Sequence, residues 1–195
     1  MRQAGTRELF AYWDRLRKGR AAPERAEIDP AAIRNVLADT FLLGIDAACL
    51  FPIRLSGTRL NALWLSEQKG RSFLDLWADD ERRDAMGLIL TVLEATRPVI
   101  AGVSAAPPGR KPMDMELLLL PLRHNGKTHA RVLGCITSAA REPWFGLIAA
   151  DKLILRSMRV IGSGEAEDTL SPHWPQAAQT PLGRRGHLTV YAGGV

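Results

Sequence analysis

Histidine and cysteine, the side chains that most often bind metals or act as nucleophiles, are few and scattered in this 195-residue chain. They are His124, His129, His173, His187, Cys49 and Cys135. None stands in a spacing typical of a zinc, calcium or nucleotide-phosphate motif, and no serine or cysteine has a context that favours nucleophilic catalysis. We therefore predict no metal site and no catalytic residue. The cysteines lie in apolar runs and are expected to be packed thiols in a reducing compartment.

Arg54 is the side chain whose position most suggests ligand recognition. Residues 50–57 alternate, which places Phe51, Ile53 and Leu55 on one face of a predicted strand and Arg54 on the other. If Arg54 points into an interior cavity, its guanidinium can bind an acidic ligand through two parallel hydrogen bonds. The alternative is that it binds backbone carbonyls or an acidic neighbour.

The net charge of +5 and the isoelectric point near 9.7 raise the question of nucleic-acid binding. The positive excess is slight and dispersed, with one local concentration at Arg15, Arg17, Lys18 and Arg20. Nucleic-acid binders usually gather positive charge on one face, so we regard this partner as disfavoured. No segment approaches the roughly 20 apolar residues that span a bilayer. The amino end also lacks the apolar run of a secretory signal. We expect a cytoplasmic protein without a membrane contact.

Apolar periodicity predicts an amphipathic helix near the amino end. Leu9, Trp13 and Leu16 recur at helical spacing, and Phe10 and Tyr12 widen the apolar stripe. Such a helix must cover an apolar surface, which is either the outer face of a sheet or a second copy of the helix itself.

Strand and helix patterns follow one another along the rest of the chain. The expected strands span residues 40–45, 50–57, 99–104, 113–122 and 129–138, and the helical segments span 58–77 and 80–96. An Asn-Gly pair at residues 125 and 126 predicts a tight hairpin turn between the last two strands. This order predicts an α+β domain. Its five-stranded antiparallel sheet would carry helices on one face and the leading amphipathic helix on the other.

The chain divides by composition into three parts. Residues 1–37 are a helical cap and linker, residues 38–140 form the α+β domain, and residues 141–195 are a C-terminal extension. Within the extension, 152–161 is expected to be one more strand or helix. Beyond about residue 162, Gly, Pro, Ser, Gln and Ala dominate, which predicts a largely flexible tail. The tail segment Arg184–Tyr191 is either disordered or a strand that adds to a partner's sheet.

Short motifs in a fixed order cover roughly residues 8–138. They are Tyr12-Trp13, Pro23-x-Arg25, Ile28-Asp29-Pro30, Ala32-Ile33, Arg54-Leu55-Ser56-Gly57-Thr58, Gly70-Arg71-Ser72-Phe73-Leu74-Asp75-Leu76-Trp77, Leu119-Leu120-Pro121-Leu122 and Arg131-Val132-Leu133-Gly134. In these motifs and in its element order, the chain resembles a family of stand-alone PAS-domain proteins of alphaproteobacteria.

The resemblance implies a sensory or regulatory protein of signal transduction and not an enzyme. Such proteins act through ligand sensing or through contact with a signalling partner on another chain, such as a histidine kinase. The leading helix, with Leu9, Phe10, Tyr12, Trp13 and Leu16, is expected to cover the sheet within a homodimer.

The PAS fold also implies a small apolar cavity between the sheet and its helices, which holds a ligand or is filled by side chains. The candidate lining residues are Arg54, Trp64, Phe73, Trp77, Met86, Ile89, Leu93, Met115, Leu117, Leu133 and Cys135. The alternative for the aromatic and methionine members is ordinary core packing. The identity of a small-molecule ligand is left open.

Haem and flavin are both disfavoured under this resemblance. Haem needs an axial histidine, and none falls on the 80–96 helix, where haem-binding PAS domains of the best-known kind carry it. Light-sensing flavin relatives need a reactive cysteine in a segment of the Asn-Cys-Arg-Phe-Leu-Gln type, which is absent. The alternative function is a small enzyme or carrier that uses the apolar cavity. It would require a buried acid with a raised pKa beside Arg54.

Overall fold

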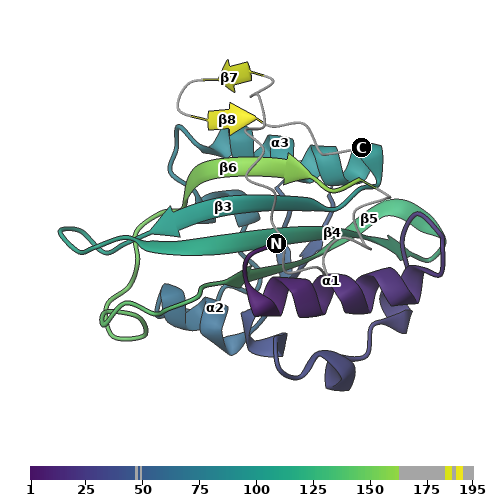
Figure 1. Cartoon of the computed structure of the whole chain (residues 1–195), viewed down its shortest axis with the longest axis horizontal. Helices are drawn as coiled ribbons and strands as arrows, with labels where there is room; N and C mark the ends of the chain where they lie inside the picture. Colours follow the sequence, from purple (N-terminus) through teal and green to yellow (C-terminus); the bar gives the residue numbers. More distant parts are fainter. Residues whose placement is uncertain (47, 49, 163–182, 186–187, 191–195) are drawn as a thin grey trace.

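The fold is built on a single sheet in the computed structural model, which describes residues 1–46, 48, 50–162, 183–185 and 188–190 (Figure 1). The strands are β1 (Thr40–Gly44), β2 (Ile53–Ser56), β3 (Val99–Ala105), β4 (Met113–His124), β5 (Lys127–Thr137), β6 (Ile154–Val160), β7 (Gly183–Arg185) and β8 (Leu188–Val190). Their spatial order is β2-β1-β5-β4-β3-β6-β8-β7. The helices are α1 (Ala4–Arg17), α2 (Thr58–Leu63) and α3 (Arg82–Ala95), with short 3-10 turns η1 (Arg25–Glu27), η2 (Pro30–Ile33), η3 (Leu37–Asp39) and η4 (Phe73–Leu76).

The predicted α+β class with an antiparallel sheet is confirmed, but five strands were too few. The first six strands of the spatial order are all antiparallel, and the sixth is β6, which pairs with β3 from Val99↔Val160 to Ser104↔Ile154. The sequence left this segment open between strand and helix. The structure explains why the sequence pattern was ambiguous. The pairing of β3 with β6 shifts register between Gly102 and Val103, and this irregularity breaks the regular alternation of side chains along β6.

The β4–β5 hairpin turns at the Asn-Gly pair, as predicted. Asn125 has φ 53° and Gly126 has φ 77°, so both central residues occupy the left-handed region that this tight turn requires. Before the turn, β4 is buried on both faces. Leu117 and Leu119 belong to the core beneath α2 and α3, whereas Leu118 and Leu120 belong to the core beneath α1. Cover on both faces explains the unbroken apolar run in this strand.

Helix α1 covers the outer face of the sheet, which confirms the predicted cap. In Figure 1 it lies in front of the sheet, across β4 and β5. Leu9, Phe10, Tyr12 and Trp13 are buried against that face, and Leu16 is partly buried at its margin. The indole Nε1 of Trp13 donates a hydrogen bond to the Pro121 carbonyl at 2.9 Å. The apolar stripe of α1 therefore packs against the sheet of its own chain.

The carboxylate of Glu116, on β4, fixes the amino end of α1 to the sheet. It accepts hydrogen bonds from Arg2 N at 2.7 Å and Gln3 N at 3.0 Å, and the hydroxyl of Thr6 donates to the same carboxylate. Glu116 is only 9% exposed. A carboxylate at this position satisfies the free N–H groups that precede the helix and complements the positive end of its dipole. Sequence reasoning did not single out Glu116, because its partners lie more than a hundred residues away.

Most of the predicted flexible tail lies outside the described residues. Its described parts are β7 and β8, and β8 pairs in parallel with β6 through Ser157↔Thr189 and Met158↔Val190. The segment proposed to add a strand to a partner's sheet thus adds its described part to the sheet of its own chain.

Candidate functional site

The residues predicted to line one cavity fall on two faces of the sheet. Phe73, Trp77, Ile89, Leu93, Met115 and Leu117 belong to the inner core, with Trp64 and Met86 partly buried at its margin. Leu133 and Cys135 belong instead to the outer core beneath α1, so their assignment to the cavity is wrong. Strand alternation explains this error. Gly134 between them faces inward, where an added Cβ would lie 2.2 Å from the ring of Phe41.

Aromatic side chains fill the centre of the inner core. The rings of Phe41 and Phe73 stack with their centroids 5.6 Å apart, and Trp77 meets Phe73 edge-on at 5.8 Å. All three are buried, and the indole Nε1 of Trp77 has no hydrogen-bond partner among the described residues. The centre of the inner core is therefore filled by side chains. The PAS resemblance allowed for either a ligand or side chains at this place.

Arg54 does not point into the interior. Its side chain is exposed on β2 and lies across Gly44 on the neighbouring strand. Its Nε sits 2.6 Å from the point where a Cβ on Gly44 would be. The prediction of an interior ligand role for Arg54 is therefore wrong. Arg54 lies on the edge strand, where its guanidinium reaches solvent without being desolvated.

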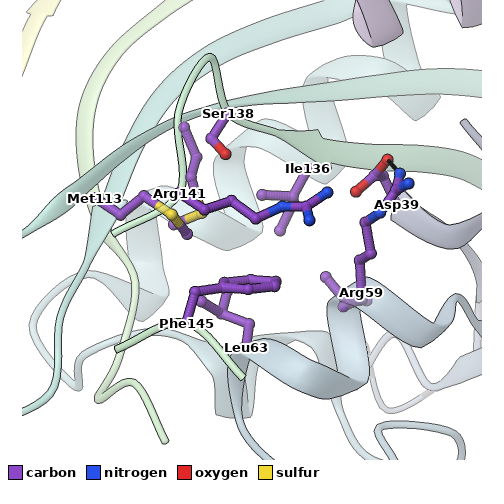
Figure 2. Close-up of a pocket in the computed structure, with 10 residues that line it drawn as sticks. Asp39, Arg59, Leu63, Met113, Ile136, Ser138, Arg141 and Phe145 are labelled. Carbon is purple, nitrogen blue, oxygen red and sulfur yellow. Dashed lines mark hydrogen bonds and ion pairs between the residues drawn. The ribbon is translucent and has the colours of Figure 1, made fainter. Parts of the chain in front are cut away.

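An opening with two other arginines lies at the edge of the inner core, and we call it the arginine pocket (Figure 2). Its lining residues are Asp39, Arg59, Leu60, Leu63, Met113, Met115, Ile136, Ser138, Arg141 and Phe145. They come from η3, α2, the start of β4, the end of β5 and the segment that follows β5. The open volume is about 20 Å³, which is room for one water-sized group.

Gly57 permits the close approach that brings Asp39 and Arg59 together. It precedes α2, and an added Cβ would lie 2.2 Å from the carbonyl oxygen of Ala38. Its N–H donates to the carbonyl of Thr40 at 2.8 Å, which holds the start of α2 against η3. With the backbones this close, Arg59 Nη1 reaches Asp39 Oδ2 at 2.5 Å. The pocket therefore depends on Gly57, which the sequence had indicated only as part of a turn motif.

Asp39 is partly desolvated in this pocket. Burial raises the pKa of its carboxyl group, while the hydrogen bond from Arg59 and the nearby charge of Arg141 lower it, and burial prevails. Its side chain is 16% exposed, against 39% for Arg59. Figure 2 shows the Arg141 side chain running across the pocket, with its guanidinium directed toward Asp39. The arrangement is an apolar floor with two cations and one anion at its rim.

Such an arrangement favours anion binding over catalysis. The ten lining residues contain one carboxyl group and neither histidine nor cysteine, so they do not pair a general acid with a general base. The alternative enzyme or carrier function would require a buried acid with a raised pKa beside Arg54, whereas the carboxyl group whose pKa burial raises is that of Asp39, beside Arg59. Among the described residues, no group of three or more His, Cys, Asp or Glu side chains is placed to hold a metal ion.

The sequence did not single out Arg59 or Arg141. The only available signal for Arg59 was its place two residues beyond Gly57, in the turn motif. Arg141 lies in the segment between β5 and β6, where apolar periodicity fades and the predicted domain ended. A site assembled from one residue before β1, one in α2 and one between β5 and β6 leaves no local pattern.

A second, more open cavity of about 280 Å³ lies between the start of α3 and the start of β6. Its Glu81 carboxylate accepts a hydrogen bond from Leu155 N at 3.3 Å, and its Arg156 donates to the Ser104 hydroxyl at 2.8 Å. Because the guanidinium here is already bonded to the protein, we place the candidate site at the arginine pocket.

Comparison with protein families gives a match over residues 1–137 to the family described as PAS domain. The chain belongs to the PAS domain family. It is therefore a sensory or signalling domain, and the resemblance recognised from its motifs is confirmed. The alphaproteobacterial origin suggested with that resemblance stays a prediction. No curated protein matches the chain.

Several solved structures are similar to this PAS protein. One is the LOV protein of Rhodobacter sphaeroides, with 17% identity and a TM-score of 0.43 over 60% of this chain and 71% of that one. Another is the PAS domain of a protein from Colwellia psychrerythraea, with 11% identity and a TM-score of 0.44 over 58% and 100%. A third is a light-oxygen-voltage domain studied with a flavin analogue, with 13% identity and a TM-score of 0.46 over 57% and 84%.

These comparisons do not support the expectation that flavin is disfavoured. The rings of Phe41, Phe73 and Trp77 occupy the centre of the core, and the arginine pocket at its edge holds about 20 Å³. The absence of flavin and haem stays a prediction.

None of the described helices is both long enough and apolar enough to cross a membrane.

Proposed function

We propose that this PAS protein is a regulatory module that acts by binding a signalling protein, such as a histidine kinase, through its surface. The observation that carries the proposal is the filled interior, in which Phe41, Phe73 and Trp77 pack against one another where a core ligand would lie. A domain whose core has no room for a ligand can still recognise a partner protein through its surface. The lack of an acid–base pair in the arginine pocket supports this function over a small enzyme or carrier.

Native mass spectrometry of the purified chain, beside a denaturing control, tests the proposal. We expect the native mass to equal one or two copies of the 21.4 kDa chain, with nothing released on denaturation. A small molecule released in stoichiometric amount would contradict a protein-binding role based on a filled core. A released flavin or haem would also overturn the predicted absence of these cofactors.

A second candidate function, small-molecule sensing, is favoured by one observation. The Trp77 Nε1 donor is buried without a partner among the described residues, which costs about 1–3 kcal/mol when no acceptor reaches it. A ligand with an acceptor atom would remove that cost. Under this function, a molecule retained by the wild type is lost from Trp77→Phe, which keeps the aromatic packing and removes the donor.

The homodimer predicted from the sequence is kept as a proposal with one change. Leu9, Phe10 and Trp13 are buried on the sheet of their own chain, so they are not available to a second chain. We therefore propose that two folded chains would contact each other through the exposed side of α1, where Ala11 and Arg15 lie. Sedimentation velocity at high micromolar concentration tests it. A monomer under those conditions would exclude the dimer.

A further inference from the structure

The guanidinium of Arg141 is a cation without a carboxylate partner among the described residues. It lies over the ring of Phe145, with its Cζ 5.4 Å from the ring centroid, and this contact holds the side chain across the arginine pocket. Its neighbour Glu142 pairs instead with Lys111 at 3.0 Å. Stacking on an aromatic ring leaves the N–H groups at the rim of the guanidinium available to an acceptor.

The pocket as a whole has one positive charge in excess. Arg59 and Arg141 contribute two cations, and Asp39 contributes one anion that Arg59 already contacts. Leu63, Ile136 and Phe145 form an apolar floor beneath these charges. A carboxylate that enters the pocket would meet charge-assisted donors in partly dry surroundings, where such hydrogen bonds are stronger than in water.

The size of the pocket limits what can enter. A volume of about 20 Å³ is room for one water-sized group, so one oxygen of a carboxylate can enter while the rest of the head group and the carbon skeleton stay at the rim. The remainder of the bound molecule must lie outside, next to the segment that carries Phe145. Two and three residues further along are Leu147, which is 76% exposed, and Ile148, which is 41% exposed.

We propose that the arginine pocket binds an acidic side chain of a partner protein, with Arg141 and Arg59 as donors and with Leu147 and Ile148 in contact with apolar residues beside that acid. This inference rests on the proposed protein-binding function and names the chemistry of the partner surface. The partner segment carries one aspartate or glutamate flanked by apolar side chains.

The test is a ¹H–¹⁵N NMR titration of the full chain, including the Nε–Hε signals of Arg59 and Arg141. The probes are a capped pentapeptide with one glutamate between leucines, the same peptide with glutamine, and sodium propionate at matched ionic strength. We expect the glutamate peptide to shift both arginine signals and to bind about tenfold more tightly than the glutamine peptide and than propionate.

Three variants separate the parts of the pocket. Arg141→Gln should lower affinity for the glutamate peptide about tenfold, and Leu147→Ser should lower it while leaving the weaker propionate binding unchanged. Arg97→Gln is the matched control, because Arg97 is an exposed arginine outside the pocket, and it should bind as the wild type does. All three positions are exposed, so each variant should keep the wild-type spectrum elsewhere.

Four results would overturn the inference. If neither propionate nor the glutamate peptide shifts the arginine signals, the pocket is not a carboxylate site. If the two peptides bind equally, the contact is apolar. If propionate binds as tightly as the glutamate peptide and Leu147→Ser changes nothing, the pocket serves a small free acid. A partner that binds wild type and Arg141→Gln equally would keep the proposed function and reject this pocket.

Discussion

Charged side chains in this PAS protein act at contacts between segments that are distant in the chain. Glu116 joins the middle of the sheet to the first residues, Arg59 joins α2 to Asp39, and Arg141 lies across the pocket that these elements form. Glu116 is buried, and Arg59 is paired with the largely buried Asp39, so replacing either should alter stability more than replacing an exposed charge.

Glu116→Gln should lower the free energy of unfolding by about 2 kcal/mol, because a neutral amide accepts the hydrogen bonds of Arg2 and Gln3 less strongly than a carboxylate. Urea denaturation followed by tryptophan fluorescence measures the change. Asp114→Asn is the control, since Asp114 is exposed on the same strand and face, and it should change the value by at most about 0.5 kcal/mol. Equal losses in the two variants would show that Glu116 is not an anchor.

The titration of Asp39 should be visible in the pH dependence of stability. Burial raises the pKa of this carboxyl group in the folded chain, so the folded state binds the proton more tightly than the unfolded state. Lowering the pH from neutral through the folded pKa should therefore stabilise the wild type relative to Asp39→Asn. Urea denaturation of both chains at pH 7 and pH 4 measures this difference. A wild type that loses stability relative to Asp39→Asn on acidification would contradict the burial of Asp39.

At the scale of elements, α1 behaves as part of the core. Its apolar stripe completes the second buried cluster, and Arg17 lies over the ring of Trp13 at 5.5 Å. The sequence predicted this helix well, because five large apolar residues at helical spacing are a strong local signal. The hairpin at Asn125-Gly126 was predicted equally well, since its backbone angles suit few other residues.

Trp13→Ala should cost about 3–5 kcal/mol, the usual loss for a large aromatic side chain removed from a core. Trp13→Phe should cost less, because it keeps most of the apolar contact and loses the hydrogen bond to Pro121. Thermal unfolding followed by circular dichroism compares them with Arg15→Ala, which lies on the exposed side of the same helix. A wild-type-like Trp13→Ala would mean that α1 is not docked on the sheet in solution.

The elements that sequence reasoning misplaced share a physical cause. Leu133 and Cys135 are apolar and buried, so composition alone could not say which face of the sheet they occupy. The pocket residues Asp39, Arg59 and Arg141 are brought together by the close contact at Gly57 and by a segment without periodicity. Tertiary contacts of this kind do not appear as spacing along a chain.

At the scale of the whole molecule, the folded unit extends beyond the PAS family match. That match ends at residue 137, whereas Trp144, Leu153 and Leu155 are buried in the inner core and β6 pairs along β3. The carbonyl of Leu63 also accepts a hydrogen bond from Ala150 N at 2.8 Å. Residues after the match therefore complete the hydrophobic core.

Truncation tests this boundary. A chain of residues 1–140 should fail to fold, because it exposes the inner core that Leu153 and Leu155 cover. A chain of residues 1–162 retains β6 and should give a dispersed ¹H–¹⁵N spectrum. Cooperative unfolding of the 1–140 chain would show that the C-terminal extension is dispensable for folding.

The anchoring of the first residues by Glu116 has a consequence for the order of biosynthesis. Arg2 and Glu116 are 114 positions apart, so α1 leaves the ribosome long before its binding surface exists. At typical synthesis rates of about 5–20 residues per second, the delay is roughly 5–25 s. During that time Leu9, Phe10 and Trp13 have no sheet to cover. The nascent chain thus presents an aromatic helix that chaperones can bind until β4 and β5 emerge.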